Sequence, residues 1–164
     1  MSISALTPRQ IPITVGEPAP DFTLKDQHRV EWKLSDALKK GDVVLCFFPL
    51  AFTSVCGTEM KCVNDEMAQW QKQGAQVIGI SCDSFAALKA WADKEGYKQT
   101  FLADMHRDVC KAYGLYWKDL NVSSRGTVVI GKSPDGQGTI KQIQAREPGK
   151  AMNWDQVLSW LSAS

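Results

Sequence analysis

Four residues of this chain carry the chemistry of a thiol site. Pro49, Thr53 and Cys56 stand in the stretch "PLAFTSVC", and Arg125 stands much later in "SSRGTVVI". Cys56 follows a run of large apolar residues and opens a stretch with helical spacing. A cysteine in the first turn of a helix faces free backbone N–H groups and the positive end of the helix dipole, and both favour the nucleophilic thiolate.

A thiolate at this position suits the attack of sulfur on a small polar electrophile such as a peroxide. In that reaction, fixed hydrogen-bond donors must polarise the O–O bond and stabilise the leaving oxygen. The candidate donors are the Thr53 hydroxyl, the Arg125 guanidinium and the backbone amides of Val55 and Cys56. Pro49 has no N–H, so it can end the strand without adding a competing donor. A packed small residue is the alternative for a lone cysteine at a helix start, and spacing alone leaves both interpretations open.

The hydrophobic pattern predicts the elements that must position these residues. We expect, in chain order, a hairpin over 21–26 and 29–34, a strand over 42–48, a helix from Val55 or Cys56 to Gln73, a strand over 75–81, a helix over 84–96, a strand over 100–104, a helix over 106–114, a hairpin over 126–131 and 138–144, and a helix over 153–163. A buried strand that leads into a cysteine at a helix start, with a late antiparallel hairpin, is typical of a thioredoxin-like fold. The predicted class is α/β, with a central mixed β-sheet flanked by helices and an N-terminal β-hairpin.

The length and composition indicate an ordinary globular chain. Of its 164 residues, 44% are hydrophobic and 23% charged, so residues 1–164 are expected to form a single domain. The net charge of +1 gives no support for a nucleic-acid surface, and no apolar run approaches the length of a membrane span. The first residues lack the pattern of a secretory signal, so we expect a cytoplasmic protein. His28 and His106 have no partners at ligand spacing, so no metal site is expected.

The candidate residues also match a known motif. The stretch "PLAFTSVC" satisfies the pattern P-x-x-x-T-x-x-C, and with it the chain resembles the peroxiredoxins, whose active-site motif this is. The stretches "VGEPAPDFTL", "VIGISCDS" and "SRGTVVI" resemble further segments of that family in the same order, so the resemblance covers nearly the whole chain. Within the family, "FFPLAFTSVC" most resembles the alkyl hydroperoxide reductase E-like, one-Cys branch.

This resemblance implies a thiol-dependent peroxidase that reduces hydrogen peroxide and organic hydroperoxides without a haem, flavin or metal cofactor. Cys56 would be the peroxidatic cysteine, which the peroxide oxidises to sulfenic acid. Thr53 and Arg125 would hold the thiolate and the peroxide, and Pro49 would shield the sulfenic acid. A homodimer is expected from the resemblance alone.

The sulfenic acid must then be reduced by an outside thiol or by a second cysteine of the chain. Cys62 lies about 9 Å of helical rise beyond Cys56, whereas a disulfide tolerates Cα atoms roughly 7 Å apart, so this pair requires local unwinding. The peroxiredoxin-Q-like branch places its resolving cysteine five residues after the peroxidatic one, where this chain has Lys61. Cys82 follows a predicted parallel strand and is a second internal candidate. We expect one-Cys chemistry with an external reductant of the thioredoxin, glutaredoxin or low-molecular-weight thiol type.

The sequence is also compatible with two other functions. A thiol–disulfide oxidoreductase on the same fold is disfavoured because the chain has no C-x-x-C motif. A peroxide sensor or holdase-like chaperone would be oxidised quickly once and turn over slowly. The remaining cysteines, Cys46 in a buried strand and Cys110 in a short helix, have no motif that supports a role in the reaction.

Overall fold

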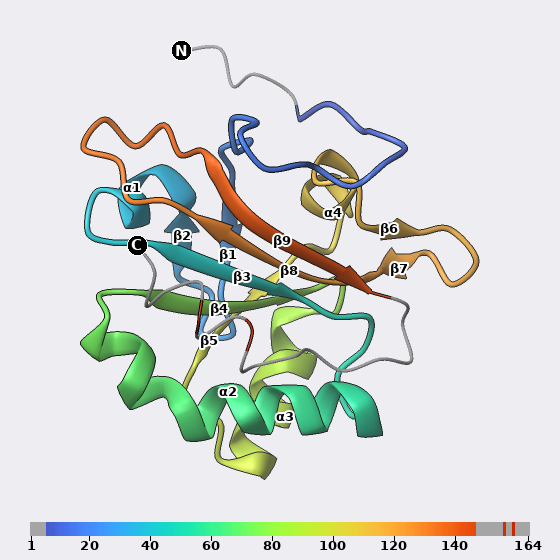
Figure 1. Ribbon diagram of the computed structural model, residues 1–164. Coiled ribbons are helices and arrows are strands. Elements are labelled where there is room, and N and C mark those ends of the chain that lie inside the picture. Colours follow the sequence, from blue (N-terminus) through green and yellow to red (C-terminus); the bar gives the residue numbers. More distant parts are fainter. Residues whose placement is uncertain (1–5, 147–155, 157–158, 160–164) are drawn as a thin grey trace.

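A five-stranded mixed sheet forms the centre of the protein, with the strand order β5-β4-β3-β8-β9 (Figure 1). β3, β4 and β5 run parallel, whereas β8 is antiparallel to β3 and β9 is antiparallel to β8. Every residue of β3 is buried, as an unbroken apolar run predicts for a strand covered on both faces. The strands are β3 (Val43–Phe47), β4 (Gln76–Ser81), β5 (Thr100–Ala103), β8 (Arg125–Ile130) and β9 (Ile140–Arg146).

This computed structural model describes residues 6–146, 156 and 159. Within that range it does not describe the side chains of Ser54, Val55, Glu59, Cys62, Glu66, Met67 and Arg146. The helix expected over 153–163 lies outside the described residues. Among the residues that are described, no helix combines the length and the apolar character needed to cross a membrane.

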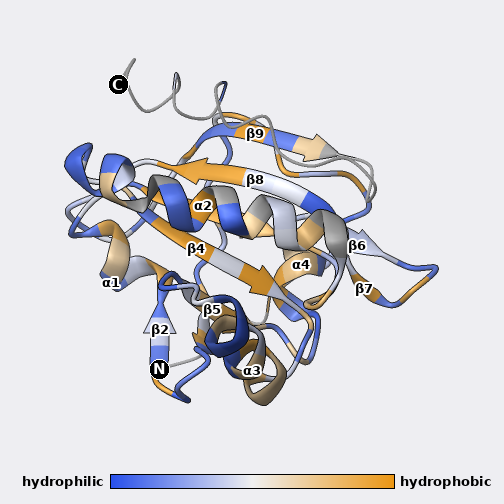
Figure 2. Ribbon diagram, turned by 90° about the horizontal axis from the view of Figure 1, so that it is seen from below, coloured by the Kyte–Doolittle hydropathy of each residue, from blue (hydrophilic) through white to orange (hydrophobic). Residues whose placement is uncertain are grey.

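Two long helices cover one face of the sheet (Figures 1 and 2). They are α2 (Ser54–Lys72) and α3 (Phe85–Glu95). α3 has the predicted signals at both ends, since the Ser84 hydroxyl accepts from the Ala87 N–H and Gly96 adopts the left-handed conformation. The buried residues on this face form what we call the α2–α3 core. Its members are Val44, Cys46, Phe48, Ala51, Cys56, Met60, Val63, Trp70, Ala75, Val77, Leu88, Trp91, Ala92, Phe101, Ala103 and Val129.

The opposite face is covered by α1 (Leu34–Leu38), α4 (Asp108–Ala112) and the N-terminal segment. The buried residues here form the α1–α4 core. They are Ile13, Phe22, Leu34, Ala37, Leu38, Val43, Leu45, Phe47, Ile78, Ile80, Cys82, Leu102, Val109, Cys110, Ala112, Tyr113, Leu115, Val128, Ile130 and Ile140. Because successive strand residues point to opposite faces, Cys46 belongs to the α2–α3 core and Phe47 to the α1–α4 core.

Short elements complete the fold. The predicted N-terminal hairpin is confirmed as β1 (Thr23–Lys25) paired antiparallel with β2 (Glu31–Lys33). The sequence prediction extended the second strand to Leu34, but this residue is buried and begins α1. It also missed the small hairpin of β6 (Tyr116–Trp117) and β7 (Val122–Ser123). Strands of two residues are too short to show a clear period of 2.

Candidate active site

The segment between β3 and α2 presents the residues of the PxxxTxxC motif. Pro49 is buried, two residues after the end of β3. Phe52 has a φ of 64°, a conformation that a bulky side chain rarely adopts and that turns the chain sharply before the helix. Thr53 then takes the N-cap position with extended backbone, and its carbonyl accepts from the Gly57 N–H at 2.8 Å. Cys56 therefore lies in the first turn of α2, where the sequence predicted it.

The Thr53 side chain does not cap the helix. Its hydroxyl instead donates to the Leu50 carbonyl at 2.8 Å, which fixes the rotamer and ties the turn together. A hydroxyl that donates one bond keeps lone pairs with which to accept another. Thr53 can therefore act as an acceptor beside the first turn of α2, and not as the donor that the sequence predicted, because the Leu50 carbonyl takes its only hydrogen.

Arg125 and Cys56 meet across the end of the sheet. β8 lies beside β3 with Gly126 in register with Phe47, so Arg125, one residue earlier, lies beside the point at which β3 ends. Its Nη2 donates to Cys56 Sγ at 3.0 Å, and both side chains are almost fully buried, with exposed fractions of 2% and 1%. A buried guanidinium favours a negative charge on the sulfur that accepts its hydrogen bond.

Asp83 holds the loop that leads to Cys56 by hydrogen bonds. Its Oδ2 accepts from the Ala51 N–H at 2.9 Å and from the Ser81 hydroxyl at 2.7 Å. Because β4 is the parallel neighbour of β3, the residues after β4 lie beside the residues after β3. Asp83 was not among the residues predicted for the site, although its place just after a parallel strand is a signal for it.

Side chains that follow α3 hold the first turns of α2. The Tyr97 hydroxyl donates to the Gly57 carbonyl at 3.0 Å, and Gln99 Nε2 donates to the Met60 carbonyl at 3.0 Å. These bonds must break if the first turns of α2 unwind. They therefore oppose the local unwinding that a disulfide between Cys56 and Cys62 requires.

The two internal candidates for a resolving cysteine differ in where they lie. The Cys62 side chain is outside the described residues, although its backbone belongs to the continuous helix α2. Cys82 does not share a core with Cys56, because it belongs to the α1–α4 core on the other face of the sheet. Cys82 directly follows the parallel strand β4, as predicted, but it lies on the other face of the sheet from Cys56. Its sulfur lies 3.9 Å from that of Cys110, which is fully buried.

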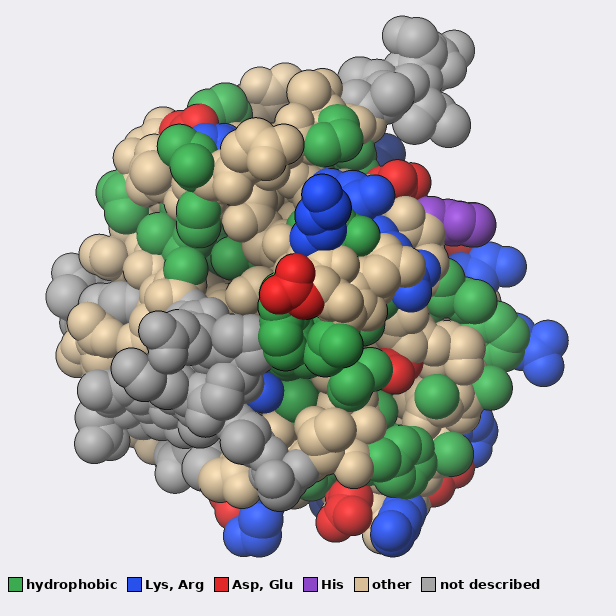
Figure 3. Space-filling model, turned by 90° about the vertical axis from the view of Figure 1, so that its right-hand side faces the viewer, with side chains coloured by type: hydrophobic (Ala, Val, Ile, Leu, Met, Phe, Trp, Pro, Cys, Tyr) green, Lys and Arg blue, Asp and Glu red, His purple; other side chains and the backbone are tan. Residues whose placement is uncertain are grey.

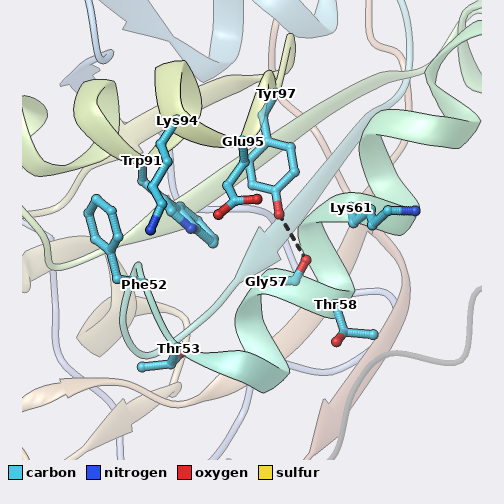
Figure 4. A pocket seen from close by; sticks show the side chains of 9 residues that line it. All are labelled: Phe52, Thr53, Gly57, Thr58, Lys61, Trp91, Lys94, Glu95 and Tyr97. Carbon is cyan, nitrogen blue, oxygen red and sulfur yellow. Dashed lines mark hydrogen bonds between the residues drawn. The ribbon is translucent and has the colours of Figure 1, made fainter.

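An open pocket of about 370 Å³ adjoins the start of α2 (Figure 4). Figure 4 shows Phe52, Trp91 and Lys94 on one side and the hydrogen bond from Tyr97 to Gly57 at its centre. The pocket is lined by Phe52, Thr53, Gly57, Thr58, Lys61, Trp91, Lys94, Glu95 and Tyr97. It reaches Thr53 but not Cys56, whose side chain is 1% exposed.

The end of the molecule at which β3 leads into α2 exposes hydrophobic side chains (Figure 3). Within the loop itself, Leu50 is 37% exposed and Phe52 is 53% exposed. The centroid of the Phe52 ring lies 6.3 Å from that of the Trp91 ring and 5.9 Å from Lys94 Nζ. Exposed apolar groups beside a candidate site favour contact with another surface.

Comparisons with known proteins agree on one family. Residues 15–143 match the AhpC/TSA family. Alkyl hydroperoxide reductase E of Mycobacterium tuberculosis is 31% identical over 156 residues, which cover 92% of this chain and 99% of that protein. Peroxiredoxin-2 of Bos taurus is 35% identical over 159 residues, which cover 91% of this chain and 77% of that protein.

Solved structures agree with this result. The reduced 2-Cys peroxiredoxin of Plasmodium vivax superposes with a TM-score of 0.82 at 26% identity, over 93% of this chain and 82% of that one. Peroxidoxin BcpB of Mycobacterium tuberculosis superposes with a TM-score of 0.79 at 26% identity, over 91% of this chain and 96% of that one. The predicted thioredoxin-like fold is confirmed by these similarities together with the mixed sheet.

Proposed function

This chain belongs to the AhpC/TSA family of peroxiredoxins and is a thiol-dependent peroxidase, and from that premise we propose that Cys56 is its peroxidatic cysteine. The observation that carries the proposal is the hydrogen bond from Arg125 Nη2 to Cys56 Sγ at 3.0 Å. It places the buried positive charge of Arg125 beside the sulfur of a cysteine in the first turn of α2, where the helix dipole also favours an anion.

The reaction begins with the Cys56 thiolate. Its sulfur attacks the terminal oxygen of a hydroperoxide, the S–O bond forms and the O–O bond breaks. The electron pair leaves with the second oxygen, which takes a proton to become water or an alcohol. Cys56 is then a sulfenic acid, oxidised by two electrons.

Arg125 and Thr53 support this step by geometry. The positive charge of Arg125, held beside Cys56 Sγ, also stabilises the negative charge that develops on the leaving oxygen. The Leu50 carbonyl holds the Thr53 hydroxyl in place. The oxygen of this hydroxyl accepts a hydrogen bond from the incoming peroxide and so orients it. Pro49 is buried and presents no N–H, so it shields the sulfenic acid without competing for it.

An external thiol completes the cycle. It condenses with the Cys56 sulfenic acid to release water and form a mixed disulfide, and a second thiol releases Cys56 as a thiol. Two observations support one-Cys chemistry: Cys82 lies across the sheet, and Tyr97 and Gln99 hold the turns that a bond to Cys62 would unwind. The proposed reductant is of the thioredoxin, glutaredoxin or low-molecular-weight thiol type.

The setting of the enzyme is part of the proposal. Residues 1–164 act as one thioredoxin-like domain in a homodimer, and the exposed side chains of Leu50 and Phe52 support a protein contact. A reducing compartment such as the cytoplasm is supported by the thiols of Cys56, Cys82 and Cys110, none of which forms a disulfide.

Two measurements test this function: the rate of peroxide consumption and the mass of the intact protein after oxidation. Reduced wild type should consume hydrogen peroxide with dithiothreitol as the reductant, and Cys56→Ser should not. One equivalent of peroxide should add about 16 Da to the wild type, as an added oxygen does. An equal rate of peroxide consumption in both proteins would contradict the proposal. A loss of about 2 Da that depends on Cys56 would contradict the one-Cys cycle and indicate an internal disulfide.

A further inference from the structure

Cys82 and Cys110 form a second pair of thiols away from Cys56. Their sulfur atoms lie 3.9 Å apart in the α1–α4 core. Cys82 is 9% exposed and Cys110 is fully buried. We propose that this pair is a second redox centre, which peroxide oxidises to an intramolecular disulfide without the participation of Cys56.

The elements around the pair bring the two sulfurs together. Cys82 directly follows β4, and Cys110 lies in α4. Asp104 fixes α4 in place, since its carboxylate accepts from the Val109 N–H at 3.2 Å and from the Cys110 N–H at 2.8 Å. A disulfide requires sulfurs about 2.05 Å apart, so the pair must close by about 2 Å, which is within the reach of side-chain rotation.

The chemistry assigns different roles to the two thiols. Cys82 is the more exposed and meets the peroxide first, whereas the hydrogen bond with Cys82 and burial raise the pKa of the Cys110 thiol. The Cys82 sulfur attacks the peroxide, the O–O bond breaks, and Cys82 becomes a sulfenic acid as water or an alcohol leaves. The Cys110 sulfur then attacks the Cys82 sulfur, and its proton leaves with the hydroxyl group as water. One peroxide thus accepts the two electrons that the pair loses.

A metal site is the other use for this cluster, and the charges disfavour it. Among the described residues, Cys82, Asp104 and Cys110 are the one group whose potential ligand atoms lie within 4.8 Å of one another, and all three are buried. A divalent cation would need two thiolates and a carboxylate in an apolar core, which leaves a buried net negative charge. Burial already raises the pKa of the Asp104 carboxyl. A disulfide removes both thiols and adds no charge.

The position of the pair separates it from the peroxidatic reaction. The sheet lies between Cys82 and Cys56, since they belong to different cores. Asp104 places an acidic group beside the pair, whereas Arg125 places a positive charge beside Cys56. Peroxide should therefore oxidise the pair more slowly than it oxidises Cys56, so the disulfide should form only when peroxide persists.

The test uses Cys56→Ser, so that its outcome does not depend on the proposed peroxidatic role of Cys56. Reduced Cys56→Ser is treated with excess hydrogen peroxide, remaining thiols are alkylated, and the protein is digested with trypsin without reduction. Before alkylation, we expect the intact protein to have lost about 2 Da. We also expect a linked pair of peptides, residues 73–89 with residues 108–111, each of which holds one of the two cysteines.

Matched variants and a metal analysis decide the result. Adding Cys82→Ser or Cys110→Ser to Cys56→Ser should abolish the linked peptides and the loss of mass. Diamide, which oxidises dithiols directly, should produce the same linkage in Cys56→Ser. Recovery of both cysteines in alkylated form after either oxidant would overturn the proposal. So would one equivalent of zinc in the purified protein that protects both thiols from alkylation.

Discussion

Arg125 and Cys56 are 69 residues apart in the chain, and yet the guanidinium of one donates to the sulfur of the other at 3.0 Å. The antiparallel pairing of β8 with β3 produces this contact, because it sets the start of β8 beside the end of β3. Each residue alone has an ordinary explanation, as a strand-end cation or a packed thiol. Their contact inside a core from which water is excluded makes them a reactive pair.

Replacing Arg125 with lysine should slow the oxidation of Cys56 by hydrogen peroxide by about a hundredfold, the usual cost of a lost transition-state donor. Lysine keeps the charge but lacks the planar fork that can bind sulfur and peroxide at once. Stopped-flow fluorescence of the reduced protein measures the rate. Arg29→Lys is the control, since Arg29 is exposed and contacts the Phe85 ring. A rate for Arg125→Lys equal to that of the control would remove Arg125 from the site.

Two substitutions of Thr53 separate the contribution of its hydroxyl to the oxidation rate from that of its side-chain shape. Thr53→Val keeps the branched side chain but loses the hydroxyl, so the oxidation rate should fall about tenfold or more. Thr53→Ser keeps the hydroxyl and should remain within a few-fold of the wild type. Peroxide-dependent oxidation of each reduced variant, measured at several peroxide concentrations, gives the second-order rate constants. Equal rate constants for the valine and serine variants would show that the hydroxyl takes no part.

Removal of the Asp83 carboxylate should loosen the loop before Cys56. In Asp83→Ala the Ala51 N–H and the Ser81 hydroxyl lose their acceptor, which should lower the free energy of unfolding by about 1–3 kcal/mol. Cys56 oxidation should slow several-fold because the loop no longer holds one geometry. Urea unfolding and stopped-flow oxidation measure the two effects. Asp93→Ala, which removes an exposed ion pair with Lys89, is the control and should change neither.

The lowered pKa of Glu17, in the N-terminal segment, should make the free energy of unfolding depend on pH. Hydrogen bonds from the Arg9 side chain and from Thr14 lower the pKa of Glu17 to about 2, from a usual 4.5. A lowered pKa in the folded state stabilises the fold above pH 4.5, and this contribution disappears as the pH falls through about 2. Glu17→Gln should therefore be less stable than the wild type at pH 7.

Urea unfolding of the wild type and Glu17→Gln over this pH range measures the difference. It should be small, since the ion pair with Arg9 is partly exposed, and it should shrink steadily between pH 4.5 and pH 2. A difference that stays constant with pH would mean that the ionisation of Glu17 does not contribute.

Local patterns in the sequence were enough to predict the elements that carry the site. The unbroken apolar run of β3 marks a buried strand, the helical stripe of α2 is long enough to show its period, and α3 has recognisable signals at both ends. The motif then set Cys56 at the helix start. The sequence did not contain the contacts of Asp83 and Tyr97, because they join residues 32 and 40 positions apart through tertiary packing.

The two cysteines of the second pair illustrate the same limit. Cys110 has charged neighbours in the chain, and a five-residue helix is too short to reveal which side is buried. Its contact with Cys82 arises from the packing of α4 against the end of β4, 28 residues away in the chain. The register of β4 decides on which face of the sheet Cys82 lies. A continuous apolar run does not indicate that register, so the face could not be predicted.

The most direct test of the central claim is stopped-flow oxidation of reduced wild type and Cys56→Ser by hydrogen peroxide, followed by tryptophan fluorescence. Trp91 is a suitable reporter, because its ring lies 6.3 Å from that of Phe52 in the loop before Cys56. The wild type should show a fast phase with a rate proportional to peroxide concentration, and Cys56→Ser should lack it. A slow phase of equal rate in both proteins would contradict the assignment of Cys56 as the peroxidatic cysteine.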